Sequence, residues 1–140
     1  MRTSENGIQL IKKYEGCRTK AYYCPAGVLT IGYGHTGPDV VPNLVWSQEQ
    51  ADAALTQDLV RFEVKVSLYE GKYHWTQNEF DALVSFAYNI GNIKSLTDNG
   101  NRSREEIKSH WLLYCNAGGK KLPGLVRRRE EELSLFSKQS

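Results

Sequence analysis

Apolar residues recur three and four positions apart in five stretches of the chain, which is the spacing that puts them on one face of an α-helix. The first stretch ends at Glu15. Each of the next three begins with Ser or Thr placed three residues before Gln or Glu, the capping-box pattern of a helix N-terminus. These three begin at Ser47, Thr76 and Ser103, and a fifth helix is predicted after Gly124.

The segment between the first two helices differs from the rest of the chain. It contains short runs rich in Tyr, Val, Ile and Thr, separated by Pro25 and Gly27, which predict a β-hairpin. Helix, hairpin and several further helices predict an α+β fold with the sheet set apart. We expect one domain over residues 1–140, with a β-rich lobe at about 16–46 and a helical lobe at about 67–140 that also takes the N-terminal helix. An active-site cleft is expected between the lobes.

Composition narrows the class of protein. The chain is 40% hydrophobic and 24% charged, as in ordinary globular domains. No apolar run approaches the roughly 18 residues of a membrane span, and the N-terminus lacks a secretory signal, so we expect synthesis in a cytoplasm and no stable membrane insertion. A net charge of +2 is too small to indicate a nucleic-acid partner. The basic cluster Arg127-Arg128-Arg129 precedes Glu130-Glu131-Glu132, which predicts a solvated, ion-paired helix face.

Cysteine and histidine positions argue against bound metals. Cys17, Cys24 and Cys115 form no paired motif, and the three histidines lack the spacing of zinc ligands. No Gly-rich phosphate loop is present. We therefore expect no metal and no cofactor, with Cys17 and Cys115 as small apolar residues. A redox-dependent Cys17–Cys24 disulfide is disfavoured, because a strand between them would hold them apart.

The predicted hairpin brings an acid, a thiol and a hydroxyl toward one region: Glu15, Cys24 and Thr30. Gly16 is suited to end the first helix, so Glu15 would lie at the negative end of the helix dipole. That position favours the protonated carboxyl group, which is the form a general acid needs in glycosidic-bond cleavage. Considered alone, Glu15 could equally be a surface residue at a helix end.

The same residues resemble a known family. Glu15, the nine-residue step to Cys24, the six-residue step to Thr30 and the following I-G-Y-G-H-T look like the catalytic signature of phage-type lysozymes, the endolysin muramidases of glycoside hydrolase family 24. Residues 85–91, S-F-A-Y-N-I-G, and the segment from Ala117 to Arg129 are similar to two later stretches of that family. Matches in register extend over nearly the whole chain.

The resemblance implies hydrolysis of the β-1,4 bond between N-acetylmuramic acid and N-acetylglucosamine in peptidoglycan. It implies that Glu15 is the general acid and that Thr30 holds the attacking water. The family usually has Asp where this chain has Cys24, although some members carry Cys there. A Cys24 thiolate could be a base toward water, which gives inversion, or a nucleophile, which gives retention. A non-catalytic Cys24 in the turn is the structural alternative.

Further residues are assigned supporting or binding roles. His35 is expected to form an ion pair or a backbone hydrogen bond that supports the site, and Gly32 and Gly34 to permit close backbone approach near substrate. By similarity of position, Thr36, Tyr88 and Asn89 are candidate sugar contacts, although Tyr88 could equally be core. Trp46, Trp75 and Trp111 are expected to pack in the core rather than stack on sugars.

Two other functions stay open. The chain could be an inactive peptidoglycan-binding module, since the usual Asp is absent, or a lytic transglycosylase, which needs a single Glu. Thr30 disfavours the latter, because water plays no part in that reaction. In each case the expected partner is the glycan strand of peptidoglycan, bound by a monomer that is made in a bacterial host cytoplasm and acts on the wall after release.

Overall fold

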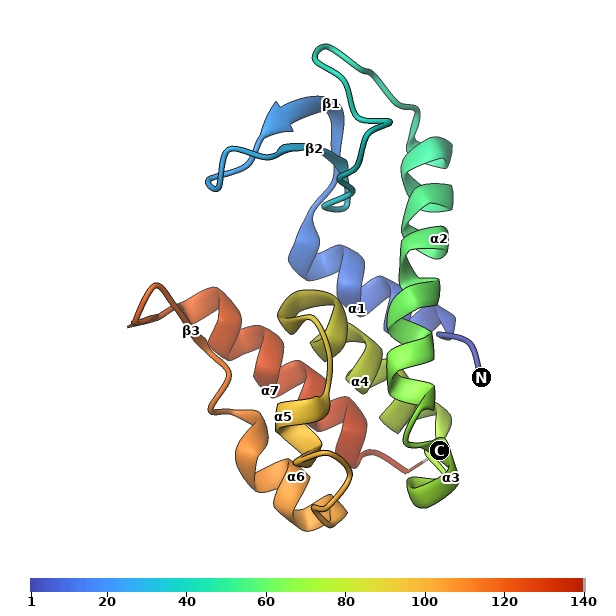
Figure 1. Ribbon diagram of the computed structural model, residues 1–140, viewed down its shortest axis with the longest axis vertical. Coiled ribbons are helices and arrows are strands. Elements are labelled where there is room, and N and C mark those ends of the chain that lie inside the picture. Colours follow the sequence, from blue (N-terminus) through green and yellow to red (C-terminus); the bar gives the residue numbers. More distant parts are fainter. Residues whose placement is uncertain (140) are drawn as a thin grey trace. The chain divides into compact units, whose positions relative to one another are not determined.

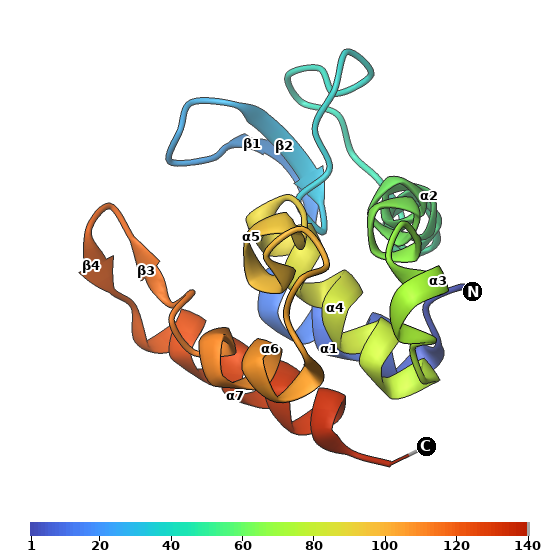
Figure 2. The ribbon, with the colours of Figure 1, turned by 60° about the horizontal axis from the view of Figure 1, so that its bottom comes forward.

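The computed structural model describes residues 1–139 and has seven helices and two small antiparallel sheets in that part of the chain (Figures 1 and 2). The chain forms two compact units, residues 11–60 and residues 1–10 with 61–140. The elements in order are α1 (Glu5–Glu15), β1 (Arg18–Tyr23), β2 (Leu29–Gly32), α2 (Gln48–Ser67), α3 (Glu70–Tyr73), α4 (Gln77–Ile90), α5 (Lys94–Thr97), α6 (Arg104–Trp111), β3 (Asn116–Ala117), β4 (Lys120–Lys121) and α7 (Pro123–Ser137). The α+β class predicted from the sequence is confirmed.

The unit of residues 11–60 is built around the β1–β2 hairpin. Cys24 N donates a 2.9 Å hydrogen bond to Val28 O, and Gly27 N donates a 2.8 Å bond to Cys24 O. Pro25 occupies the second position of this turn, and Gly27 has the positive φ (79°) that closes a three-residue hairpin loop. The local sequence therefore determines where the hairpin turns, as predicted.

A second tight turn follows β2. Ile31 and His35 exchange two backbone hydrogen bonds of 2.9 Å across it. The chain then returns along the other side of β1, where Trp46 N donates to Thr19 O at 2.7 Å. These bonds bring the indole of Trp46 against Gly32, and a Cβ added to that glycine would lie 3.0 Å from the ring.

The other unit is a helical cluster. α4 packs against α7, and α6 contacts both α5 and α7, as both views show (Figures 1 and 2). Aromatic side chains fill the core between them, with Phe86 edge-on to Trp111 at 5.5 Å between ring centroids and Trp111 5.0 Å from Phe136. The capping boxes predicted for Thr76 and Ser103 are present at the starts of α4 and α6.

The α7 helix corrects one expectation. Its charged run forms the predicted i,i+3 and i,i+4 ion pairs, but these pairs are buried rather than solvated. Arg129 and Glu132 are 0% exposed and Arg128 is 3% exposed. Glu132 also accepts hydrogen bonds from Ser85 Oγ (2.6 Å) and Trp111 Nε1 (3.2 Å), so the buried carboxylate has both cationic and neutral partners.

Smaller features also go beyond the sequence pattern. The short helices α3 and α5 and the β3–β4 hairpin are too brief to leave a periodic signal. α7 begins at Pro123, slightly before the predicted start, and Pro is favoured in the first helical turn. Within residues 1–139, no helix combines the length and the apolar character that crossing a membrane would need.

Candidate active site

Glu15 is the last residue of α1 and is half-buried. Gly16 N donates a 3.0 Å hydrogen bond to Lys12 O, and Gly16 adopts a positive φ of 67°. The predicted glycine cap is therefore present, and it ends the helix directly after the carboxyl group. β1 begins at Arg18, two residues after Gly16.

Cys24 follows β1 at the start of the hairpin turn, where its side chain is half-buried. Hydrogen bonds from the backbone N–H groups of Val28 and Ala26 lower the pKa of the Cys24 thiol, and a hydrogen bond from the Thr30 hydroxyl adds to this effect. Backbone donors that converge on a sulfur stabilise its thiolate. The turn that closes the hairpin thus also favours the thiolate form of Cys24.

Thr30 lies across the hairpin from Tyr22 and is only 4% exposed. Its hydroxyl donates a 2.9 Å hydrogen bond to Val28 O. A hydroxyl group has one proton and two lone pairs, so the same proton cannot serve Val28 O and the Cys24 sulfur at once. The hydroxyl can therefore donate either to Val28 O or to the Cys24 sulfur, and in both orientations its lone pairs can accept from a third group. We call Cys24 and Thr30 the coupled pair.

His35 is held by two carboxylates. Nδ1 lies 2.7 Å from Asp58 Oδ2, and Nε2 lies 2.9 Å from Asp39 Oδ2. Burial opposes protonation of the ring, but the hydrogen bonds to Asp58 and Asp39 outweigh it and raise the pKa of His35 above its ordinary value. The ion pair expected for His35 is present, and its partners come from α2 and from the loop after the second turn.

The other candidate residues are distributed between the two units. Thr36 is an exposed residue of the unit of residues 11–60. Tyr88 and Asn89 lie at the end of α4 in the helical unit, where Asn89 is exposed and Tyr88 packs edge-on against Phe62 at 5.2 Å. The structure thus brings Cys24 and Thr30 together, and it gives Tyr88 the packing contact of a core-type residue.

The two glycines after Ile31 both adopt positive φ angles, 68° for Gly32 and 87° for Gly34. At Gly32 the neighbour is the Trp46 ring, which would meet a Cβ there, and the close approach of substrate to Gly32 and Gly34 stays a prediction. Trp75 and Trp111 are buried as expected, whereas Trp46 is half-buried.

Sequence reasoning missed the partners of His35. Asp58 is 8% exposed and lies on the same face of α2 as Leu55 and Phe62. An acidic residue on an apolar helix face is a signal that a buried partner exists, although the sequence does not name that partner. Among residues 1–139, no group of His, Cys, Asp and Glu side chains is arranged to hold a metal ion.

The chain resembles known proteins over nearly its whole length. The family model described as Phage lysozyme matches residues 12–132. The endolysin of Lactococcus phage c2 is 45% identical over 142 residues, which cover 99% of this chain and 61% of that protein. The chain likewise spans 54% of the endolysin of Bacillus phage B103, so it is shorter than these curated relatives.

Solved structures agree with this assignment. The muramidase domain of SpmX from Asticaccaulis excentricus superposes with a TM-score of 0.86 at 34% identity, covering 99% of both chains. The endolysin of Escherichia coli O157:H7 phage FAHEc1 gives 0.82 at 33% identity, covering 98% of this chain and 94% of that one. The lysozyme-like fold and the family resemblance predicted from the sequence are confirmed: the chain belongs to the phage lysozyme family.

Proposed function

We propose that this chain is a peptidoglycan hydrolase of the endolysin type, with residues 1–140 acting as one catalytic domain. Its substrate is the β-1,4 bond between N-acetylmuramic acid and N-acetylglucosamine. The observation that carries this proposal is the coupled pair of Cys24 and Thr30, formed in the hairpin that follows Glu15. Membership of the phage lysozyme family supports the same substrate class.

In the proposed reaction, Glu15 gives its proton to the glycosidic oxygen as the bond to the anomeric carbon breaks. Positive charge develops on the sugar ring, and a water molecule attacks the anomeric carbon from the opposite face. The leaving sugar departs with a new hydroxyl group, and Glu15 is left as a carboxylate that solvent reprotonates.

Cys24 and Thr30 act on the water. The Thr30 proton is donated to Val28 O, which leaves its oxygen lone pairs able to accept a hydrogen bond from the water. The Cys24 thiolate, stabilised by the turn N–H groups, accepts the second proton and becomes a thiol. This arrangement makes Cys24 a base and predicts inversion at the anomeric carbon.

A lytic transglycosylase is the second candidate, because it also needs one Glu. In that reaction the muramoyl hydroxyl group replaces water as the nucleophile, and its proton passes to the Glu15 carboxylate that the first step leaves, so the reaction requires neither Thr30 nor Cys24. An inactive wall-binding module is the third candidate. The proposed partner in each case is the glycan strand, approached by a monomeric protein that is made in a bacterial host cytoplasm and reaches the wall after release.

The test compares two isosteric substitutions at opposite ends of α1. Glu15→Gln should abolish clearing of a peptidoglycan suspension, whereas Glu5→Gln, at the exposed first residue of the helix, should clear it at the parent rate. Circular dichroism checks that both variants are folded. A folded Glu15→Gln protein that retains near-normal activity would contradict the proposal.

Product analysis then separates the mechanisms. Early-time NMR of the released reducing end should show the α-anomer, which corresponds to inversion. The β-anomer would assign Cys24 as a nucleophile, and an anhydro sugar, seen also by mass spectrometry, would identify a transglycosylase. If no sugar is released, the remaining candidate is the inactive wall-binding module.

A further inference from the structure

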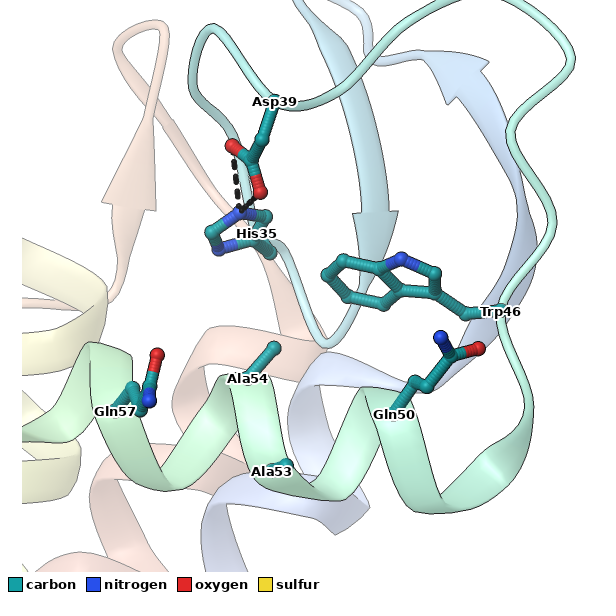
Figure 3. A pocket seen from close by; sticks show the side chains of 7 residues that line it. All are labelled: His35, Asp39, Trp46, Gln50, Ala53, Ala54 and Gln57. Carbon is teal, nitrogen blue, oxygen red and sulfur yellow. Dashed lines mark hydrogen bonds and ion pairs between the residues drawn. The ribbon is translucent and has the colours of Figure 1, made fainter.

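A shallow pocket of about 280 Å³ lies beside α2 in the unit of residues 11–60 (Figure 3). None of its lining residues is Glu15, Cys24 or Thr30. Its volume is just below the roughly 300–1,000 Å³ found for ligand cavities, so it suits a single ring rather than a long chain. The lining side chains are His35, Asp39, Trp46, Gln50, Ala53, Ala54 and Gln57.

The sequence of α2 creates the floor of this pocket. Four lining residues are spaced i, i+3, i+4 and i+7, so they share one face of the helix. The middle two are Ala53 and Ala54, whose small side chains leave the space open between the amides of Gln50 and Gln57. Figure 3 shows Ala54 directed toward the space between His35 and Trp46.

Trp46 supplies a fixed aromatic wall. One part of the indole rests on Gly32, where the missing side chain makes room for it. His35 contacts the indole at 5.3 Å between ring centroids, with the planes tilted by 38°. Because these contacts already hold the ring, a ligand would meet a preorganised surface and would pay little conformational entropy for ordering it.

The polar groups around the indole are mostly neutral. Gln50 Oε1 accepts from Ser47 N at 2.8 Å, which leaves its NH₂ group as a donor. Gln57 also lines the pocket and is exposed, and its amide carries both donor and acceptor atoms. The charged lining groups are His35 and Asp39, and Asp58 stands behind His35 as its second carboxylate.

These features select among ligand classes. No Lys or Arg lines the pocket and Asp39 is exposed, so anions such as phosphate are disfavoured. The two rings touch each other and therefore cannot sandwich a flat aromatic base. A saturated sugar ring matches these groups in two ways. The C–H groups on its face carry positive character, which the negative face of the indole attracts. The hydroxyl groups at its edge can form hydrogen bonds with the amides of Gln50 and Gln57.

We propose that this pocket is an accessory binding site for a single N-acetylated hexosamine ring of the wall glycan, separate from the residues that cleave it. That the ligand is a saturated, hydroxylated ring is inferred from the pocket. That this ring comes from the wall glycan rests on the proposed function. Trp46 therefore contributes more than the core packing expected from the sequence.

The test follows the three indole Nε1–H signals by NMR while N-acetylglucosamine is added to the whole chain. The Trp46 signal should shift with a dissociation constant on the order of 1 mM, as expected for one small ring on an open surface. The Trp75 and Trp111 signals should stay in place because both side chains are buried. Inorganic phosphate should leave all three signals unmoved.

Two variants locate the sugar. Ala54→Leu places a larger side chain in the floor and should weaken binding at least tenfold, and Gln57→Ala should weaken it severalfold. Thr56→Leu makes a comparable change at an exposed residue of α2 outside the pocket lining and should leave binding unchanged. Wall clearing measured on the same proteins keeps this result separate from the proposed hydrolysis.

The possible outcomes are distinct. A Trp46 shift in a protein that fails to clear peptidoglycan would support the pocket and contradict the proposed hydrolase. Clearing without a Trp46 shift, or equal binding by Ala54→Leu and the parent, would overturn the pocket proposal. A Trp46 shift with D-alanyl-D-alanine but not with the sugar would overturn it too, because it would identify the peptide stem as the ligand.

Discussion

The imidazole Nδ1 of His35 lies 2.7 Å from Oδ2 of Asp58, across 23 residues of sequence. Asp58 belongs to α2, and His35 closes the turn after β2, so this ion pair joins the hairpin to the helix within one unit. The His35 side chain is 17% exposed and that of Asp58 is 11% exposed, which shields the pair from water. Removing one partner of such a shielded ion pair costs more stability than removing one partner of an exposed pair.

The first prediction is that stability falls as pH rises through the neutral range. The pKa of His35 is raised in the folded protein above its ordinary value of about 6.5. Its contribution is therefore complete below about pH 6.5 and is lost as pH rises through the higher folded pKa. Urea unfolding at pH 6 and pH 9 should show that the free energy of unfolding decreases by up to about 1.4 kcal/mol for each unit by which the pKa is raised.

The matched variants for this test are His35→Asn and His74→Asn. His74 is exposed and has a left-handed backbone conformation that Asn tolerates, so its substitution should preserve both stability and the pH dependence. His35→Asn should lose about 2 kcal/mol at pH 6 and much of the decrease toward pH 9. An unchanged pH profile in His35→Asn would show that the ion pair does not control it.

A second prediction concerns the contact between Gly32 and Trp46. Gly32→Ala introduces a Cβ at 3.0 Å from the indole, at a position where φ is 68°. Backbone strain costs about 1–2 kcal/mol and the steric overlap adds to it. Gly27 has a similar φ of 79°, but a Cβ added there would have no atom within 4 Å. Gly27→Ala therefore measures the cost of the backbone strain without steric overlap. Chemical denaturation should show the greater loss for Gly32→Ala, and equal losses would exclude the overlap.

These examples show which features the sequence could predict. Capping boxes and the Pro25-Ala26-Gly27 turn are local, because a few adjacent residues supply both the donors and the acceptors. The N-caps of α4 and α6 and the hairpin were accordingly predicted at the correct residues. The Cys24–Thr30 pair was also within reach, since a tight turn fixes both positions.

Long-range partners could not be predicted in the same way. The link from His35 to Asp58 depends on how the hairpin packs on α2, which no local pattern specifies. The buried ion pairs of α7 were misread because charged runs usually face solvent. A closer look at spacing would have helped, since Arg129 and Glu132 lie between Leu125 and Phe136 on one helical stripe.

A third prediction follows from that buried cluster. Glu132→Gln removes the carboxylate that forms ion pairs with both Arg128 and Arg129, so each buried guanidinium loses this ion pair. The free energy of unfolding should fall by about 3 kcal/mol, measured by urea titration. Glu130→Gln is the same change at an exposed position of α7 and should stay within about 0.5 kcal/mol of the parent. Equal effects of the two substitutions would contradict the role of burial.

A fourth prediction concerns the reactivity of Cys24. Because turn N–H groups lower the pKa of this thiol, iodoacetamide should alkylate Cys24 faster at pH 7 than it alkylates Cys17 or the buried Cys115. Peptide mapping by mass spectrometry would give the three rates, and clearing activity should fall in step with the Cys24 rate. Thr30→Val removes the hydroxyl group that can turn from Val28 O to donate to the sulfur, and it should shift the pH dependence of Cys24 alkylation to higher pH. A Cys24 rate equal to that of Cys17, or full activity after complete Cys24 alkylation, would remove the thiolate from the proposed mechanism.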